Sequence, residues 1–228
     1  MFSSESLNEL AKLYVKLSNS KCVGLGEVPD QLRNYLMSGD LVYVGLDNNL
    51  CIKSTVKLAL ELIGLGLDVE LVSKSLNWRD FESLVGEYLG LNNYYVIKNL
   101  RFSNRRFEVD VLGIDQVSAL AVAIDCKHWS PGYGKRGRIT NIASEHRAKV
   151  EELSKGCRQL LSKHRLLSSV EVFIPIIVTL TDIVRGYVGG SFVVPILRFN
   201  DFIANVRYYL EALTEGSGGI TNKCFDRV

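Results

Sequence analysis

FEVDVLG at residues 107–113 and SALAVAIDCK at residues 118–127 are the two stretches that decide the fold. The first is strand-like and the second begins with a run of apolar and small residues (118–124), so each predicts a strand. The short link between them predicts antiparallel neighbours. Because side chains alternate faces along a strand, Asp125 and Lys127 are expected to project together while Cys126 points the other way. With Asp110 on the neighbouring strand, two carboxylates and a lysine are expected at the ends of adjacent strands. This grouping is typical of a divalent-metal site with a positive charge beside it, as used in phosphodiester hydrolysis.

Further strands and helices surround this pair. Residues 94–102 form another strand-like run, joined to the next strand by a short link, so an antiparallel meander is expected. A long helix is predicted over about residues 142–163. The strand predicted at residues 170–180 is β-branched on both faces and is therefore expected to be central in the sheet. A strand at residues 192–197 and a final helix opened by Asn200 complete an α/β pattern.

The helix that precedes these strands begins at a recognisable cap. Asn77 is a good N-cap, and Asp80 three residues later can answer its backbone as in a capping box. An apolar stripe follows on one face of this helix: Trp78, Phe81, Val85 and Tyr88. Glu82 lies on or beside this stripe, where a carboxylate needs either a metal or a basic partner at the rim of the core. Glu87 is out of phase with the stripe and is expected to face water.

The chain is expected to contain two domains and a tail. Residues 1–75 form a small N-terminal α+β domain in this prediction, residues 76–213 form the main domain, and residues 214–228 form a flexible tail. The N-terminal domain combines three helices with one hairpin, at residues 5–18, 29–36, 41–52 and 54–65. This order suggests a winged-helix-like module. Residues 1–75 contain seven Lys and Arg residues and nine Asp and Glu residues, so their net charge is negative, which argues against a DNA-reading surface. A packing or protein-contact role is at least as well supported.

Composition predicts a globular protein. The chain has 228 residues, of which 47% are hydrophobic and 23% are charged, so it can bury a core without covalent staples. The apolar run at residues 170–180 is interrupted and is shorter than the roughly 20 residues needed to cross a bilayer. The N-terminus has no basic region before an apolar one, as a signal peptide would have. A cytoplasmic protein with no membrane partner is therefore expected.

The cysteines point to the same compartment. The chain has five of them, an odd number, and they are widely scattered with no Cys-x-x-Cys pair. Because cytoplasmic proteins usually keep their thiols reduced, reduced cysteines are expected.

The positive charge is concentrated in one region. Between residues 98 and 165 there are fourteen Lys and Arg residues against seven Asp and Glu residues, a net charge of +7, although the whole chain carries only +2. Two of the seven acids are the expected metal ligands, so the surface around them is more basic than this count suggests. A polyanion is the natural partner of such a region.

Candidate nucleic-acid contacts lie in this basic region. The glycine-rich loop that ends in KRGR (135–138) predicts a segment that tracks phosphates, with an ordinary solvated turn as the alternative. Trp129 is expected either to stack on a base or to cap the core. His146 and Arg147 on the next helix are secondary candidates, and His128 is either a phosphate contact or a surface residue. The expected contacts are Arg105, Arg106, His128, Lys135, Arg136 and Arg138.

The order of these elements resembles the PD-(D/E)xK nuclease superfamily, which has the restriction-endonuclease-like fold. The matching order is a helix with Glu82, a strand with Asp110, and a strand that ends in DCK (125–127), followed by a helix and a further strand. Within that superfamily, the pattern is similar to archaeal Holliday-junction resolvases and to restriction enzymes that act on modified DNA.

The resemblance covers about residues 77–213 and departs from the usual motif at two positions. Val109 replaces the proline that commonly precedes the first acid, and Asp125 stands where glutamate is commoner. The implied fold is a mixed β-sheet flanked by helices. The implied partners are duplex or branched DNA, and a homodimer is a further expectation.

The resemblance also implies an activity and a set of site residues. The activity is that of a metal-dependent endonuclease that hydrolyses DNA phosphodiester bonds in restriction, repair or recombination. Mg²⁺, or Mn²⁺ in its place, would be held by four groups: Glu82, Asp110, Asp125 and the backbone carbonyl of Cys126. Lys127 would orient the attacking water. Because the two aspartates repel each other, one of them is expected to take up a proton more readily without metal.

Other interpretations of the same residues stay open. Either aspartate can form an ordinary salt bridge with Lys127 at a sheet edge, which contributes little at a surface. A non-catalytic nucleic-acid-binding module with the same fold would bind DNA with strong salt dependence and would not cleave it. A structural or assembly protein would use residues 1–75 as a partner-binding surface.

Overall fold

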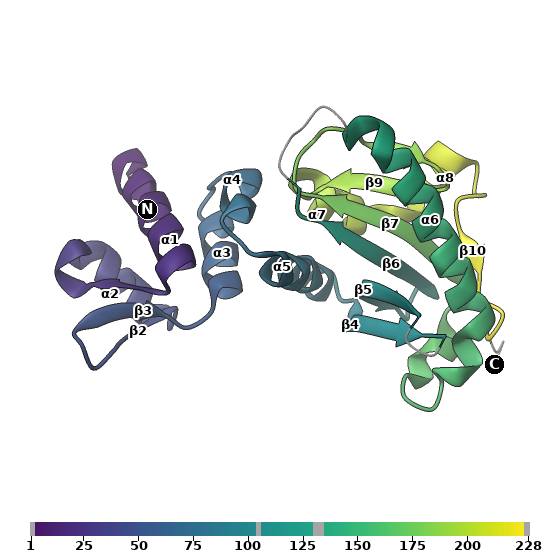
Figure 1. Cartoon of the computed structure of the whole chain (residues 1–228), viewed down its shortest axis with the longest axis horizontal. Coiled ribbons are helices and arrows are strands. Elements are labelled where there is room, and N and C mark those ends of the chain that lie inside the picture. Colours follow the sequence, from purple (N-terminus) through teal and green to yellow (C-terminus); the bar gives the residue numbers. More distant parts are fainter. Residues whose placement is uncertain (1–2, 104–105, 130–134, 226–228) are drawn as a thin grey trace. The chain divides into compact units, whose positions relative to one another are not determined.

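The structure is a computed structural model that describes residues 3–103, 106–129 and 135–225. The chain divides into two compact units, Met1–Leu84 and Val85–Val228, and each has its own sheet (Figure 1). The division falls within helix α5 (Trp78–Leu91), whereas the sequence placed the boundary after residue 75, before this helix.

The first unit is built on a three-stranded antiparallel sheet in the order β1-β3-β2. Its strands are β1 (Cys22–Gly24), β2 (Val42–Val44) and β3 (Asn49–Ile52). Its helices are α1 (Ser4–Ser20), η1 (Leu25–Glu27), α2 (Asp30–Ser38), α3 (Thr55–Gly64) and α4 (Val69–Lys74). The three predicted helices and the hairpin are confirmed. The short elements β1 and α4 were not predicted, because runs of three to six residues show no clear periodicity.

The second unit is built on a seven-stranded mixed sheet in the order β4-β5-β6-β7-β9-β8, with β10 paired to β7. Its strands are β4 (Tyr95–Phe102), β5 (Phe107–Asp115), β6 (Leu120–Lys127), β7 (Val172–Thr179), β8 (Gly186–Val188), β9 (Ser191–Pro195) and β10 (Ile220–Thr221). The first three form the predicted antiparallel meander. Strands β6, β7 and β9 are parallel, and β7 is central between the other two, as predicted.

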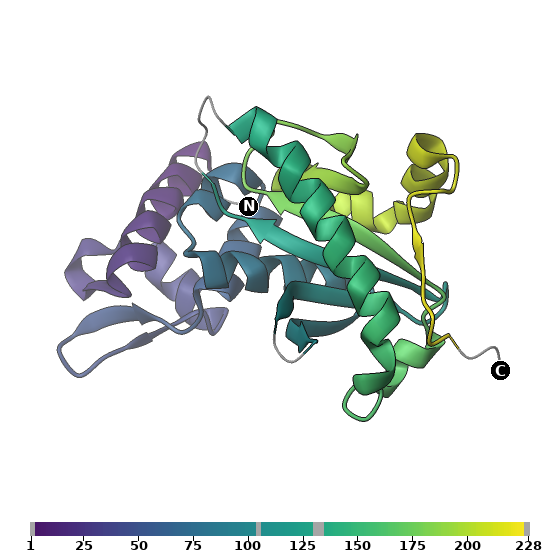
Figure 2. The ribbon, with the colours of Figure 1, turned by 45° about the vertical axis from the view of Figure 1, so that its right-hand side comes forward.

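Helices cover both faces of this sheet (Figure 2). Helix α6 (Lys135–Gly156) lies across one face, over β7 and β9. Helix α7 (Ile196–Ala204) packs on the opposite face, and the ring contact between Tyr88 of α5 and Phe199 of α7 places the end of α5 on that face too. Gly113 on β5 allows α5 to approach, because a Cβ there would lie 2.9 Å from Leu89. The second unit is therefore a mixed α/β sheet flanked by helices.

Several helix boundaries differ from the prediction. The long helix begins at Lys135 and ends at Gly156, and the short 3-10 turns η2 (Cys157–Gln159) and η3 (Arg165–Ser169) follow it. The final helix, expected to open at Asn200, is two helices, α7 and α8 (Val206–Thr214), that meet at Asn205. No helix in the described part of the chain combines the length and the apolar character needed to span a bilayer.

The predicted N-cap of α5 is observed, but one residue of its predicted buried stripe is exposed. The N–H of Asp80 donates to Oδ1 of Asn77 at 2.9 Å, which confirms the N-cap. Phe81 is buried and Glu87 is exposed, as predicted. Trp78, however, is 56% exposed, so its prediction as part of the buried stripe is wrong. Its ring lies instead against the guanidinium of Arg79.

Four cysteines form disulfides, contrary to the expectation of reduced thiols. Cys22 joins Cys51 across β1 and β3, and Cys157 joins Cys224 near the C-terminus. Cys126 belongs to neither pair. The partners are 29 and 67 residues apart, so tertiary folding brings them together and their spacing in the sequence gives no sign of it.

The C-terminal segment is anchored at least to Cys224, contrary to the expectation of a flexible tail. Ile220 pairs with Phe173 on β7. The amide of Asn222 donates to two backbone carbonyl oxygens at 2.8 Å each, and the disulfide of Cys224 follows. A two-residue strand pairing, side-chain hydrogen bonds and one disulfide hold this segment, and none of them gives a periodic pattern in the sequence.

Candidate active site

Strands β5 and β6 separate at the two predicted aspartates. Their pairing ends at Val111 and Ile124, and the next residues along the two strands are Asp110 and Asp125. Here Oδ2 of Asp110 accepts a hydrogen bond of 2.7 Å from the backbone N–H of Cys126. The side chain thus satisfies a backbone donor where the strand ladder has ended. The two aspartates are therefore neighbours on adjacent strands, as the sequence predicted.

Asp110 also sits at a break in the regular pleat of the sheet. Asn99 on β4 lies level with it and has a left-handed backbone conformation (φ 53°), which is uncommon for a residue in a strand. Val109 and Leu112 belong to the same core cluster although they are three residues apart. In a regular strand, residues at that spacing face opposite sides. The break allows the Asp110 carboxylate to reach across to β6.

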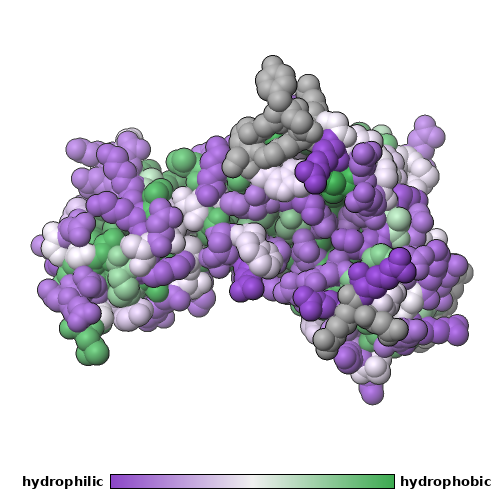
Figure 3. Space-filling model, in the orientation of Figure 1, coloured by the Kyte–Doolittle hydropathy of each residue, from purple (hydrophilic) through white to green (hydrophobic). Residues whose placement is uncertain are grey.

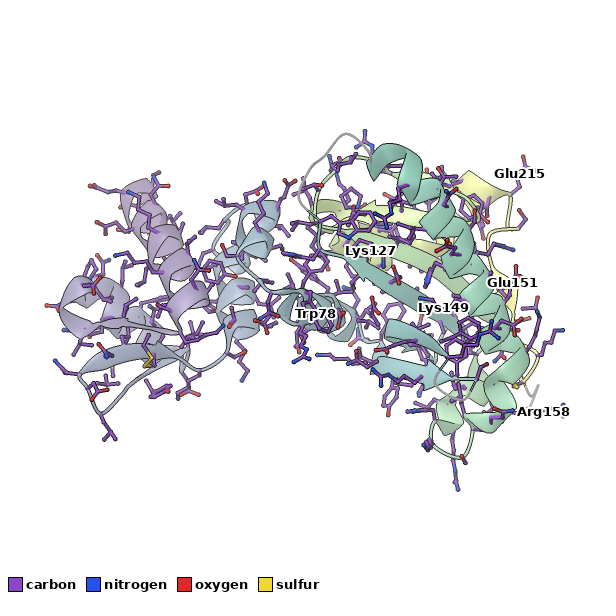
Figure 4. The ribbon with its side chains drawn as sticks, in the orientation of Figure 1. Trp78, Lys127, Lys149, Glu151, Arg158 and Glu215 are labelled. Atoms are coloured by element: carbon purple, nitrogen blue, oxygen red, sulfur yellow. A yellow bond between two sulfur atoms is a disulfide. The ribbon has the colours of Figure 1, made fainter. Side chains whose placement is uncertain are left out.

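Asp125 is buried between two lysines. It is only 6% exposed, and its Oδ2 forms an ion pair with Nζ of Lys127. Nζ of Lys149, from α6, lies 3.2 Å from the other carboxylate oxygen, Oδ1. Figure 4 shows Lys127 and Lys149 on β6 and α6. The predicted shared direction of Asp125 and Lys127 is confirmed, and Lys149 is a site residue that the sequence motif did not reveal.

His146 lies on α6, on the side that packs against the sheet, and belongs to the buried surroundings of Asp125. It is 2% exposed, and its Nε2 lies 2.9 Å from the carbonyl oxygen of Ala123. Its Nδ1 has no hydrogen-bond partner among the described residues. Burial lowers the pKa of His146 to about 4, although the Asp125 charge opposes this shift. The suggestion that His146 contacts phosphate is wrong, because the ring is enclosed by the protein.

The adjacent candidate, Arg147, is also structural. Its guanidinium donates to the hydroxyl of Tyr187 at 3.2 Å and to the carbonyl oxygen of Gly190 at 3.1 Å, and it pairs with Glu151. These contacts tie α6 to the β8–β9 hairpin. They give Arg147 a structural role, and its contact with DNA stays a prediction.

The two aspartates differ in their affinity for protons. Burial and the neighbouring Asp125 charge raise the pKa of Asp110 above its usual value. Burial acts in the same direction on Asp125, but the ammonium of Lys127, with His146 and Lys149, outweighs it and holds the Asp125 pKa below its usual value. Asp125 is therefore the firmly ionised member, and Asp110 takes up a proton first. This agrees with the expectation that one of the two carboxylates is protonated more readily.

The donor set suits a hard divalent cation. Two adjacent carboxylates are sufficient for Mg²⁺, which keeps several waters and also binds substrate phosphate oxygens. No group of three or more His, Cys, Asp or Glu side chains arranged to hold a metal occurs among the described residues. Glu82 lies in the first unit, whereas Asp110 and Asp125 lie in the second. The second unit thus supplies two of the three predicted acidic ligands.

The predicted basic loop is helical from Lys135 onward. The group Lys135, Arg136 and Arg138, which we call the basic turn, forms the first turn of α6. Its prediction as a loop is wrong, because α6 begins seven residues earlier than its apolar pattern indicated. The side chains of Lys135 and Arg136 lie outside the described residues, as does Arg105.

The remaining candidates lie beside the cluster or on the surface. Trp129 packs against a small core cluster that includes Ile139 and Ile177, so the interpretation as a core cap is supported. His128 is half-buried. Arg106 is exposed, and its guanidinium lies 5.4 Å from the ring centroid of Phe107.

The fold and the cluster define a mixed α/β protein with a buried pair of carboxylates flanked by two lysines. No protein-family model matches the chain, and no curated protein sequence matches it. Among solved structures, the chain is similar to that titled "Crystal structure of protein VC1899 from Vibrio cholerae", with a TM-score of 0.37 and 15% sequence identity. The match covers 91% of this chain and 51% of the other, so this chain spans about half the length of that protein.

Proposed function

We propose that this protein is a metal-dependent endonuclease that hydrolyses phosphodiester bonds in DNA, with a restriction-endonuclease-like second unit. One observation carries the proposal: Asp110 and Asp125 lie on adjacent strands of a meander, with Lys127 paired to Asp125. The crossover through α6 to the parallel strand β7 follows directly. These are the residues on which the resemblance to the PD-(D/E)xK superfamily rests, in the same order.

The carboxylates of Asp110 and Asp125 would hold Mg²⁺ or Mn²⁺, together with the backbone carbonyl of Cys126. The chemistry that such a cation would supply is stabilisation of the negative charge that develops on the phosphate as the bond to the leaving oxygen breaks. Lys127 would orient the attacking water and favour its deprotonation. Lys149 adds a second ammonium beside Asp125, so it helps to keep that carboxylate ionised at the reacting centre.

Other parts of the chain have supporting roles in this proposal. By the resemblance to the PD-(D/E)xK superfamily, Glu82 would be the third acidic ligand. The basic turn, with Arg105, Arg106 and His128, contacts the DNA backbone, and the face of the second unit seen in Figure 3 is mainly hydrophilic. The first unit, as a winged-helix-like module, provides a packing or partner-binding surface, and two copies of the chain form a homodimer.

A cleavage assay tests the proposal. The full chain is incubated with branched, single-stranded and duplex DNA in the presence of Mg²⁺ or Mn²⁺, and the products are separated on denaturing gels. Cleavage is expected with metal and not with a chelator. The variants D110N and D125N should each lose it, because each removes a ligand charge and little volume. The control variant E108Q removes a half-buried carboxylate on β5, paired to Arg101, and should cut normally.

Two results would contradict the endonuclease proposal. The first is cleavage by D110N or D125N at the wild-type rate, which would place the chemistry elsewhere. The second is tight, salt-dependent DNA binding with no cleavage of any substrate under either metal. That result would favour a non-catalytic nucleic-acid-binding module.

A further inference from the structure

A recess with an aromatic lining lies in the second unit, between the β8–β9 edge of the sheet and helices α7 and α8. Its volume is about 380 Å³, within the usual size of small-ligand sites. Phe192, which is fully buried, forms part of its lining, together with Phe202 and Tyr209. The three rings touch in sequence: the centroids of Phe192 and Phe202 are 5.2 Å apart, and those of Phe202 and Tyr209 are 5.0 Å apart. Phe192 and Phe202 are buried, whereas Tyr209 is half-buried, so Tyr209 is the ring of this series that offers stacking surface to a flat ligand.

The recess also carries charges that suit an anion. Arg185 and Arg198 line it, against the single carboxylate of Asp201. Arg185 is 66% exposed in its side chain, and its contact with Asp182 is long, at 3.6 Å. Asp201 is already engaged, because its Oδ2 accepts a hydrogen bond of 2.8 Å from the hydroxyl of Tyr209. The two guanidinium groups are therefore available for phosphate oxygens, which they bind with fitting geometry.

The recess lies near the candidate active site along the edge of the sheet. Pro195, which lines the recess, is in register with Thr179 on β7, and Thr179 is in register with Lys127 on β6. Two strand spacings separate Pro195 from Lys127, a backbone distance of about 10 Å. The candidate site lies on the α6 face of the sheet and the recess lies on the α7–α8 face. A bound strand would therefore pass from one to the other around the carboxyl ends of the parallel strands, where open α/β sheets commonly bind ligands.

We propose that this recess binds a nucleobase together with its phosphate. The base stacks on Tyr209, and Arg185 and Arg198 hold the phosphate. The same chemistry is present in a free mononucleotide and in an unpaired base of a nucleic-acid strand. The strand is the source favoured by the short distance to Lys127, and this choice of source rests on the proposed function.

Binding measurements on the full chain test the inference. The D110N background prevents cleavage, and the probes are a fluorescent single-stranded oligonucleotide of about twelve nucleotides and AMP. The variant Y209A should weaken binding of the oligonucleotide by about 5- to 150-fold, the effect typical of losing one stacked base. R198A changes an exposed side chain and should lower the salt slope of binding by about 0.7. Y95A, an exposed tyrosine on the opposite edge strand β4, is the matched control.

A crosslinking experiment identifies the contact directly. An oligonucleotide that carries one 5-iodouracil is irradiated with the protein, and the linked peptide is mapped by mass spectrometry. The expected site lies within residues 185–213. Much tighter binding of the oligonucleotide than of AMP identifies the strand as the source, whereas equal binding, with the same loss in Y209A, identifies the free nucleotide.

The inference is overturned if Y209A and R198A both bind the oligonucleotide as the control does, or if the crosslinks map outside this region. Its failure is distinct from failure of the proposed function. If the chain cuts DNA but these two variants have no effect on binding, the proposed carboxylate site is supported and the recess proposal is wrong. If the chain binds nucleotides through Tyr209 but cuts no DNA, the recess proposal is supported and the endonuclease proposal is wrong.

Discussion

Removing the charge of Asp110 and removing that of Asp125 should have different effects on the free energy of unfolding. In D125N the ammonium groups of Lys127 and Lys149 would lose the carboxylate that neutralises them in a largely buried position. In D110N the loss removes a charge that burial and Asp125 already disfavour, and the amide oxygen can still accept from the N–H of Cys126. We therefore expect D125N to lower the free energy of unfolding and D110N to leave it unchanged or slightly raised.

The exposure of the lysines sets the size of the D125N effect. Removing one partner of a fully buried pair costs about 3–5 kcal/mol, and exposed pairs contribute about 1 kcal/mol or less. The side chains of Lys127 and Lys149 are 23% and 24% exposed, so water can solvate part of the unpaired charge. A loss of about 2 kcal/mol is therefore expected for D125N. In a unit of this size, that loss lowers the melting temperature by about 4–8 °C.

Thermal and urea unfolding at pH 7 without metal measure these changes. The control is E108Q, whose carboxylate forms an exposed pair with Arg101, and it should change stability by less than about 1 kcal/mol. If D125N melts together with the wild type and E108Q, then the two lysines do not depend on Asp125 for their neutralisation. If D110N is the more destabilised variant, the assignment of ionised and protonated partners is reversed.

Three further predictions concern protonation, Glu82 and DNA binding. The pKa of His146 is about 4 in the folded chain and near 6.5 in the unfolded chain. Between pH 4 and pH 6.5, the unfolded state therefore binds a proton on His146 that the folded state does not bind. Stability should then fall by about 1.4 kcal/mol per pH unit as the pH drops from 6.5 to 4, and H146Q should flatten this profile in thermal melts. E82Q should lower the cleavage rate at least 100-fold without loss of stability, and E87Q should do neither; a destabilised but fully active E82Q would remove Glu82 from the site. Neutralising the basic turn should reduce the slope of log affinity against log salt by up to about 0.9 per lost phosphate contact, and an unchanged slope would make the turn an ordinary surface.

The elements that the sequence predicted correctly are those with a clear repeat of apolar residues or a clear helix N-cap. The meander, the central strand β7 and the N-cap at Asn77 follow from alternation, β-branching and local hydrogen bonding, which are properties of neighbouring residues. The adjacency of Asp110 and Asp125 follows from the same local rules, because a short link between two strands determines their pairing.

The remaining features depend on tertiary contacts. Lys149 reaches Asp125 only because α6 crosses the sheet above β6, and no local pattern indicates that crossing. The disulfide of Cys157 with Cys224 depends on where the chain end returns. The break at Asn99 also has no sequence signal, since asparagine adopts left-handed conformations in turns far more often than in strands.

The pair of lysines changes how the site should be understood. A nuclease motif with one lysine beside two carboxylates carries a net negative charge, which favours a divalent cation by itself. Here Lys127 and Lys149 both contact Asp125, and Asp110 is the carboxylate that protonates first. Without a substrate, the two ammonium groups offset the two carboxylates, so the cluster is close to neutral and a cation gains little from entering it alone. A DNA phosphate supplies the missing negative charge, so on the endonuclease proposal the cation and the substrate should strengthen each other's binding at this site.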